Sequence, residues 1–251
     1  LKEIFNAEVN ISSRIKDLIK IPKKKYKNLK HYLDEIEVVN NIKYNSKQKE
    51  AIMSGLTSGI SIITGGPGTG KTTIIKAIVE LYQTLNNLSY EALMEEMALL
   101  APTGRASKRL SESTNVGAKT IHRFLKWHKE ANSFEINEYN KDISKFIIID
   151  EFSMVDINLF DSLLKGLTRD VQIILVGDYN QLPSVGPGML LKDLIDSNLI
   201  NTISLDLLYR QGKGSFIPIL ADSIKKGDES NILAKANDYC FLECSKNSIR
   251  T

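Results

Sequence analysis

Residues Ile60 to Thr72 read Ile-Ser-Ile-Ile-Thr-Gly-Gly-Pro-Gly-Thr-Gly-Lys-Thr and are the most informative segment of the sequence. Its first five residues are mostly apolar, and its last eight fit the pattern G-x-x-x-x-G-K-[ST]. A helical pattern follows from Lys71 to about Leu85. A strand, a glycine-rich turn and a helix in this order let backbone N–H groups wrap a polyphosphate. The sequence therefore predicts an ATP-binding phosphate loop formed by Gly65, Gly66, Pro67, Gly68, Thr69, Gly70, Lys71, Thr72 and Thr73.

Three further apolar runs alternate with helical patterns along the chain, at Met97 to Ala101, Phe146 to Asp150 and Val171 to Val176. The helices are expected near Arg105 to Ser111, Val155 to Leu167 and Met189 to Ile195. This alternation predicts an α/β domain whose parallel sheet is covered by helices on both faces. Ligands bind at the carboxyl ends of the strands in such sheets. The functional residues are therefore expected just after each apolar run.

An acidic pair, Asp150 and Glu151, ends the third apolar run. Beside a phosphate loop, Asp150 is expected to hold Mg²⁺ together with the hydroxyl of Thr72, and Glu151 to polarise the attacking water. Lys71 is expected to reach the β- and γ-phosphates. The alternative is a charged cap at a helix N-terminus. Because the phosphate loop is complete, the pattern favours ATP hydrolysis.

The composition is that of a globular protein. The 251 residues are 42% hydrophobic and 25% charged, and no apolar run approaches the roughly 20 residues that a membrane helix needs. The chain begins at Leu1 without an initiator Met, which predicts a piece of a longer protein. Two cysteines, Cys240 and Cys244, cannot complete a four-ligand zinc site. We expect them to be buried, reduced thiols of a cytoplasmic protein.

The positive charge is concentrated near the N-terminus. Residues 1–50 hold 12 Lys/Arg and 7 Asp/Glu, with the excess centred on Lys23, Lys24, Lys25, Lys27 and Lys30. Such a run either follows a nucleic-acid backbone or is a solvated connector, and the sequence leaves both interpretations open.

Six motifs occur in a fixed order between about Ile42 and Asp228. They are Gly65 to Thr72, Ala101 to Ala106, Thr120 to Arg123, Asp150 to Asp156, Gly177-Asp178 with Gln181 to Gly188, and Tyr209 to Gln211. Together they resemble the RecD-like branch of superfamily 1 DNA helicases, the relatives of the exonuclease V alpha subunit. The resemblance implies a RecA-like P-loop NTPase domain with a small helical N-terminal appendage.

The resemblance also implies roles around the nucleotide. Gln48 would read the adenine, since an amide can both donate and accept. Gln181 would sense the γ-phosphate, and Arg210 would act as an arginine finger. The implied catalytic set is Lys71, Asp150, Glu151, Gln181 and Arg210.

DNA contacts are implied on the same sheet edge, at Pro102, Thr103, Arg105, Thr120 and His122. Relatives carry a small β-hairpin near the strand-separation point, at the position of residues 127–144. Its aromatic residues either stack on bases or pin the hairpin, and we favour the second role for Trp127, Phe134 and Tyr139.

The domain boundaries follow from these assignments. We expect a helical N-terminal segment at 1–40, a RecA-like ATPase domain at 41–236, and the possible start of a truncated second RecA-like domain at 237–251.

The resemblance implies a helicase that uses ATP and Mg²⁺ to move 5′-to-3′ along single-stranded DNA and to unwind duplex junctions in recombination or repair. It also implies partner subunits of a helicase–nuclease complex, and no membrane. Two alternatives remain: a DNA-binding ATPase switch that does not unwind, and an ATPase that acts on protein.

Overall fold

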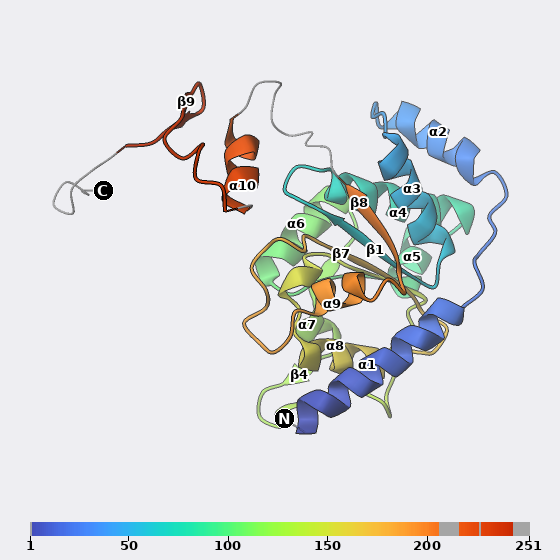
Figure 1. Ribbon diagram of the computed structural model, residues 1–251. Helices are drawn as coiled ribbons and strands as arrows, with labels where there is room; N and C mark the ends of the chain where they lie inside the picture. Colours follow the sequence, from blue (N-terminus) through green and yellow to red (C-terminus); the bar gives the residue numbers. More distant parts are fainter. Residues whose placement is uncertain (1, 206–215, 226, 243–251) are drawn as a thin grey trace. The chain divides into compact units, whose positions relative to one another are not determined.

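The computed structural model describes residues 2–205, 216–225 and 227–242. The chain divides into two compact units, Leu1–Asp206 and Leu207–Thr251, which are drawn in Figure 1 and are described separately here. The predicted boundaries at 40/41 and 236/237 remain predictions. Within the described ranges, no helix is both long and apolar enough to cross a membrane.

The larger unit is built on a parallel six-stranded sheet with the strand order β3-β2-β6-β7-β1-β8. Ile62 of β1 lies opposite Leu175 of β7 and Thr202 of β8. The central strands are buried along their whole length, which explains their continuous apolar runs. The bounds are β1 Ile60–Gly65, β2 Met97–Ala101, β3 Ala118–Thr120, β6 Phe146–Ile149, β7 Gln172–Gly177 and β8 Asn201–Leu205.

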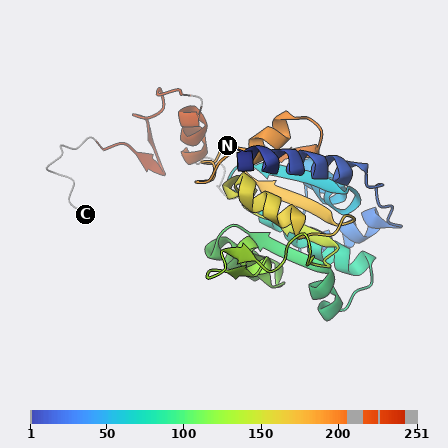
Figure 2. The ribbon, with the colours of Figure 1, turned by 90° about the horizontal axis from the view of Figure 1, so that it is seen from below.

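Helices cover both faces of this sheet, as predicted (Figures 1 and 2). One face carries α1 (Lys2–Lys20), α7 (Ile121–Phe124), η1 (Phe152–Met154), α8 (Ile157–Lys165) and α9 (Leu190–Asp196). The other carries α2 (Leu29–Val39), α3 (Ser46–Thr57), α4 (Lys71–Leu85), α5 (Tyr90–Glu96) and α6 (Gly104–Thr114).

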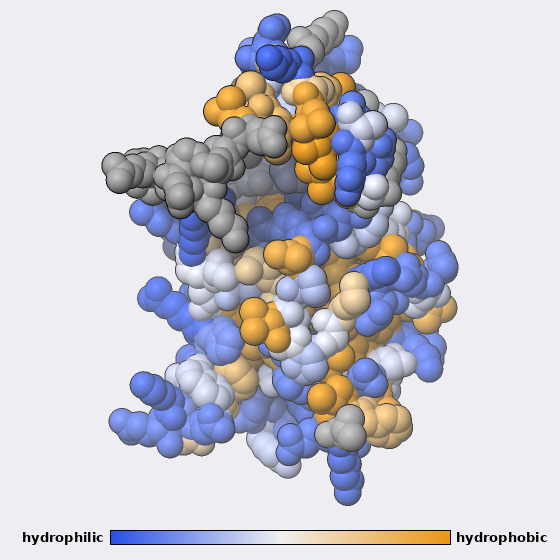
Figure 3. Space-filling model, turned by 60° about the vertical axis from the view of Figure 1, so that its left-hand side comes forward, coloured by the Kyte–Doolittle hydropathy of each residue, from blue (hydrophilic) through white to orange (hydrophobic). Residues whose placement is uncertain are grey.

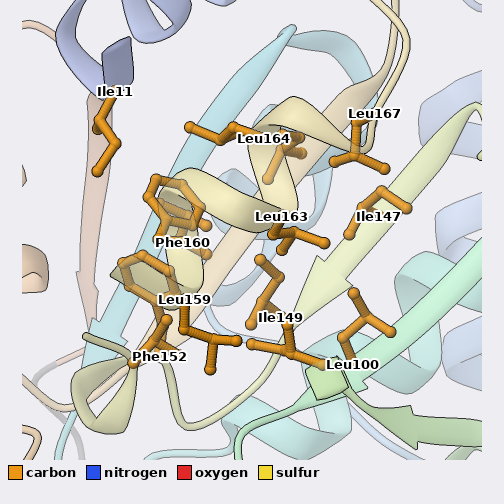
Figure 4. Packing of buried hydrophobic residues seen from close by; sticks show 14 of the residues in the cluster. Ile11, Leu100, Ile147, Ile149, Phe152, Leu159, Phe160, Leu163, Leu164 and Leu167 are labelled. Atoms are coloured by element: carbon orange, nitrogen blue, oxygen red, sulfur yellow. The ribbon is translucent and has the colours of Figure 1, made fainter. Parts of the chain in front are cut away.

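The first face has a core of aliphatic and aromatic side chains. Figure 4 shows Leu163 of α8 beside Ile147 and Ile149 of β6, with Phe160 of the same helix in the same core. The α1 helix joins this core through Ala7, Ile11, Ile15 and Leu18, which recur at helical spacing. Each of the three larger side chains stabilises the fold by about 1.5–3 kcal/mol. The predicted N-terminal helix is therefore packed into the domain.

Local signals set where the helices begin and end. Pro22 follows α1 directly after Ile21 and stops it. Asn45 and Gln48 form a reciprocal capping box at the start of α3. Asp156 caps α8 by accepting from the backbone N–H of Leu159 at 2.9 Å.

The smaller unit contains α10 (Ile217–Lys225) and an antiparallel pair, β9 (Lys235–Ala236) with β10 (Tyr239–Cys240). The expectation that Cys240 is buried is wrong, because its side chain is exposed on this short two-stranded pair. Cys244 lies outside the described residues.

Candidate active site

Three of the predicted motifs meet at the carboxyl edge of the sheet. Gly65 ends β1, Asp150 follows β6, and Gly177 ends β7, the strand between them. The register pairs Thr64 with Gly177 and Ile149 with Leu175, so the three strands end at nearly the same level. The sheet therefore brings the phosphate loop, the acidic pair and the loop after β7 to one place.

The phosphate loop is held by its own side chains. The Lys71 ammonium donates to the carbonyl oxygens of Gly65 at 2.5 Å and Gly66 at 3.0 Å, and the Thr69 hydroxyl donates to Gly66 at 2.9 Å. Gly70 has a φ of +92° just before α4 begins, a conformation that favours glycine. The first N–H groups of α4 have no partner within the helix and so favour an anion at this point.

Gln48 packs against the phosphate loop. The side chain is only 5% exposed. Its Oε1 accepts from the N–H of Asn45 at 3.1 Å, and its Nε2 donates to the carbonyl of Thr69 at 3.3 Å. A Cβ on Gly70 would lie 2.5 Å from the same Nε2. The contact of Gln48 with adenine remains a prediction. The bond to Thr69 shows that Gln48 also helps to position the phosphate loop.

Asp150 is a half-buried carboxylate close enough to Lys71 to feel its charge. Burial raises the pKa of Asp150 from 3.8 to about 6, despite the opposing effects of the Glu151 N–H and of the Lys71 charge. The Glu151 N–H donates to Oδ1 of Asp150 at 2.9 Å, which fixes the carboxylate. A carboxylate with a raised pKa in a phosphate site is suited to a cation.

Glu151 has an unusual backbone and an orphaned oxygen. Its φ of +52° lies in the left-handed region, which costs a non-glycine residue about 1–3 kcal/mol. Its Oε2 is buried without a hydrogen-bond partner in the described structure, and its side chain does not cap η1. Glu151 stands at the N-cap position of η1 but forms no side-chain capping bond there, and its strain and unpaired oxygen point to a functional role.

The residues present fit Mg²⁺. The described part of the chain has no group of three or more His, Cys, Asp or Glu that could hold a metal ion. Mg²⁺ bound with a nucleotide needs only one or two protein oxygens, because phosphates and waters supply the rest. The Thr72 hydroxyl in the first turn of α4 and the Asp150 carboxylate are such hard oxygen donors.

Gln181 is exposed on the loop that follows β7. Its N–H donates to the carbonyl of Asp178 at 3.1 Å. Asp178 is buried and accepts from the N–H of Asn180 at 3.0 Å, which shapes the turn. The γ-phosphate role of Gln181 remains a prediction. Arg210, the predicted arginine finger, lies outside the described residues.

The predicted DNA residues Thr103 and Thr120 follow neighbouring strands, since Ala101 of β2 pairs with Thr120 of β3. Both are helix caps: Thr103 accepts from the N–H of Ala106 at 3.2 Å, and Thr120 accepts from that of Arg123 at 3.1 Å. A capping hydroxyl keeps its own proton to donate to a phosphate. Two further predicted residues lie beside Thr103, the half-buried Pro102 and the exposed Arg105.

His122 contacts the predicted hairpin. β4 (Trp127–His128) and β5 (Ser133–Phe134) pair antiparallel, which confirms a hairpin within 127–144. The Trp127 and Phe134 rings lie 4.7 Å apart, and the His122 ring lies 6.3 Å and 5.8 Å from them. Trp127 and Phe134 contact each other across the hairpin, whereas Tyr139 is exposed, and the choice between pinning the hairpin and stacking on bases stays a prediction.

Two hydroxyl groups at this edge were not singled out by the sequence. The oxygens of Thr64, in β1, and Ser153, in η1, are buried without a hydrogen-bond partner among the described residues. A Cβ on Gly177 would lie 3.1 Å from the backbone nitrogen of Ser153. Both residues lie inside recognisable motifs, Thr64 in Ile60 to Thr72 and Ser153 in Asp150 to Asp156, but nothing in the pattern sets them apart.

Exposed apolar side chains are also present. Figure 3 shows them in separate groups among hydrophilic residues on the face in view. Exposed apolar residues in the segment after β7 include Leu182, Val185 and Met189. Scattered exposed apolar residues are normal for a protein surface.

Known proteins share this sequence and fold. Residues 48–187 match the AAA domain family. RecD, a RecBCD enzyme subunit of Mycobacterium tuberculosis, is 33% identical over 205 residues, which cover 74% of this chain and 35% of that protein. The ATP-dependent RecD2 DNA helicase of Deinococcus radiodurans is 34% identical over 184 residues, covering 73% and 24%.

The structure of the Pif1 helicase from Candida albicans is similar in fold, with a TM-score of 0.54, 24% identity, and coverage of 73% of this chain and 44% of that one. The chain spans about a third or less of the length of these two curated relatives. The sheet, the phosphate loop and these similarities show a RecA-like P-loop fold, and the chain belongs to the AAA domain family.

Proposed function

We propose that this chain is the ATP-hydrolysing motor domain of a DNA helicase that moves 5′-to-3′ along single-stranded DNA in recombination or repair. The observation that carries the proposal is the acidic pair: a half-buried Asp150 under the influence of Lys71, followed by a strained Glu151 with a carboxylate oxygen that has no hydrogen-bond partner. Asp150 as a metal ligand would serve nucleotide binding alone, but a protein that only bound nucleotide would have no need of a base such as Glu151. The similarity to the RecD2 helicase supports DNA as the substrate.

The roles within the site follow from chemistry. Lys71 exchanges its loop carbonyl partners for the β- and γ-phosphates and neutralises charge that develops during hydrolysis. Thr72 and Asp150 hold Mg²⁺, which neutralises phosphate charge when bound. Glu151 takes a proton from water at its carboxylate and orients that water for attack. The family resemblance adds Gln181 at the γ-phosphate, Gln48 at the adenine and Arg210 as the finger.

The ATP and DNA residues have a direct structural connection. The backbone N–H of Asp150 donates to the carbonyl of Leu100 at 2.9 Å. Leu100 lies in β2, three residues before Thr103, and β2 lies between β6 and β3, the strand that ends at Thr120. A shift of Asp150 on nucleotide binding would therefore reach Thr103 through one hydrogen bond and β2, and Thr120 through the neighbouring strand β3.

Partners and location complete the proposal. ATP and Mg²⁺ are the cofactors, and single-stranded DNA and duplex junctions are the nucleic-acid partners. The RecD relatives are subunits of the RecBCD enzyme, so we include partner subunits of a helicase–nuclease complex. The exposed free thiol of Cys240 is suited to the reducing cytoplasm.

The test is the rate of ATP hydrolysis measured as single-stranded DNA is added. We expect DNA to raise the rate, and we expect the double variant Thr103→Val/Thr120→Val to weaken that stimulation more than the rate without DNA. A rate of ATP hydrolysis that does not change when single-stranded DNA is added would favour an ATPase acting on protein. DNA-stimulated hydrolysis without strand displacement by the complete protein would favour a switch.

A further inference from the structure

The proposed function leaves unused the basic run near the N-terminus. Residues 20–30, which we call the basic connector, join α1 to α2 and contain Lys20, Lys23, Lys24, Lys25, Lys27 and Lys30. No Asp or Glu occurs anywhere in residues 18–33. A run of lysines without acidic neighbours in the sequence produces a local positive potential, although the net charge of the whole chain is only +3.

The connector is anchored to the domain at its middle. The backbone N–H of Lys24 donates to the carbonyl of Thr57 at 2.8 Å, and the Lys24 ammonium lies 5.8 Å from the centre of the Tyr82 ring. Tyr26 is partly buried and packs against the core of the second face. Lys24 and Tyr26 therefore hold the connector in place, which reduces the entropy lost when the connector binds a partner.

The remaining lysine side chains of the connector are exposed to solvent. Lys23 and Lys25 flank the anchored Lys24 in the chain. Both are exposed, as are Lys20, Lys27 and Lys30, and none of these five forms an ion pair among the described residues.

Two nearby acids are already engaged. Glu96 accepts from the Lys145 ammonium at 2.6 Å, and Asp34 accepts from that of Lys49 at 3.2 Å. Asp170 also acts on Lys24 electrostatically and is exposed. The five displayed ammonium groups therefore remain available to an external anion.

The connector lies away from the proposed active site. Thr57, its backbone partner, precedes β1, whereas the phosphate loop follows that strand. Six residues of β1 separate the two edges, or about 20 Å at the usual strand rise. Figure 1 shows the connector as the blue trace leading from α1 to α2. A ligand here would be a second one, distinct from ATP and from the single strand at the carboxyl edge.

We propose that the basic connector binds the phosphate backbone of double-stranded DNA without reading its sequence. Sites for single strands combine cations with exposed aromatic rings on which bases stack, but here Tyr26 is turned into the core and only ammonium groups are displayed. Duplex DNA offers about one charge per 1.7 Å of axis, twice the density of one strand. The connector thus supplies a duplex anchor to a motor that grips single-stranded DNA elsewhere.

The test compares duplex binding by the wild-type chain and by Lys23→Gln/Lys25→Gln/Lys27→Gln, using fluorescence anisotropy of a labelled blunt duplex over a range of salt concentrations. Each lost phosphate contact lowers the slope of log affinity against log salt by about 0.9, so we expect a decrease of about 2–3. A matched variant, Lys2→Gln/Lys43→Gln/Lys47→Gln, removes three exposed charges outside the connector and should leave the slope nearly unchanged.

Three results would overturn the proposal: an unchanged slope in the connector variant, an equal decrease in the matched variant, or an equal loss of affinity for an oligothymidine strand. The last result would show a general attraction for polyanions. The affinity for oligothymidine also separates this proposal from the helicase proposal. If only the connector proposal is wrong, the wild type and both variants still bind oligothymidine. If the helicase proposal is wrong, none of the three proteins binds oligothymidine. Equal melting temperatures of the three proteins provide the folding control.

Discussion

Replacing Asp150 with Asn should stabilise the protein while abolishing its chemistry. Burial raises the pKa of this carboxyl from 3.8 to about 6, so the folded chain carries an unfavourable charge at neutral pH. A pKa shift of one unit corresponds to about 1.36 kcal/mol, so the charged Asp150 lowers the free energy of unfolding by about 3 kcal/mol at neutral pH. The amide keeps an oxygen that can accept from the Glu151 N–H, but its new NH₂ group also needs a partner. We therefore expect a net gain of about 1–3 kcal/mol.

The stability difference between Asp150→Asn and the wild type should depend on pH. Below about pH 4 both the folded and the unfolded state hold the Asp150 proton, so the carboxyl adds no difference between them. Between 3.8 and about 6 the folded state keeps a proton that the unfolded state has lost, so the free energy of unfolding falls as pH rises. Above about pH 6 the full cost persists. The advantage of Asp150→Asn should grow through this window and then level off.

The assay is urea unfolding, followed by circular dichroism in the presence of a chelator, at several values of pH. Asp156→Asn is the matched control, because asparagine also caps a helix and should leave the stability of α8 nearly unchanged. Added Mg²⁺ and ATP should stabilise the wild type more than Asp150→Asn. If Asp150→Asn were less stable than wild type at neutral pH, or differed from it equally at every pH, the account of Asp150 would be wrong.

Three further substitutions test the rest of the site. Lys71→Ala should lower the ATPase rate by at least about a hundredfold in a steady-state assay, since it removes one electrostatic contact to the transition state; wild-type turnover would refute the phosphate role. Glu151→Gln should bind ATP and Mg²⁺ but hydrolyse slowly, as measured by nucleotide titration and single-turnover kinetics; weaker binding with an unchanged rate per bound ATP would make Glu151 a metal or structural residue. Gly65→Ala should lower the melting temperature, because its Cβ would lie 2.9 Å from the carbonyl oxygen of Leu205, whereas Gly66→Ala meets nothing within 4 Å and should not; equal melting temperatures of the two variants would refute the packing argument.

Strong periodic signals made much of the fold predictable. The helix expected from Lys71 to Leu85 is observed with those bounds, and the four expected strands are present. The edge strands β3 and β8 were missed, because β3 has three residues and β8 alternates buried with half-buried positions after an exposed first residue. Neither presents the continuous apolar run that reveals a buried strand.

The site was predictable where a motif fixes both spacing and chemistry. The glycine-rich loop and Asp150-Glu151 lie together because parallel strands end at a common edge. The contacts of Gln48 with Thr69 and of His122 with Trp127 were not predictable. They depend on packing between segments, which no local pattern encodes.

The central claim is that nucleotide hydrolysis at the phosphate loop is coupled to single-stranded DNA. The most direct test is the steady-state ATPase rate of the protein with and without a saturating oligothymidine strand, with Lys71→Ala as the background control. We expect the strand to raise the wild-type rate severalfold and to leave the Lys71→Ala rate at background. A wild-type rate that is the same with and without the strand would contradict the account.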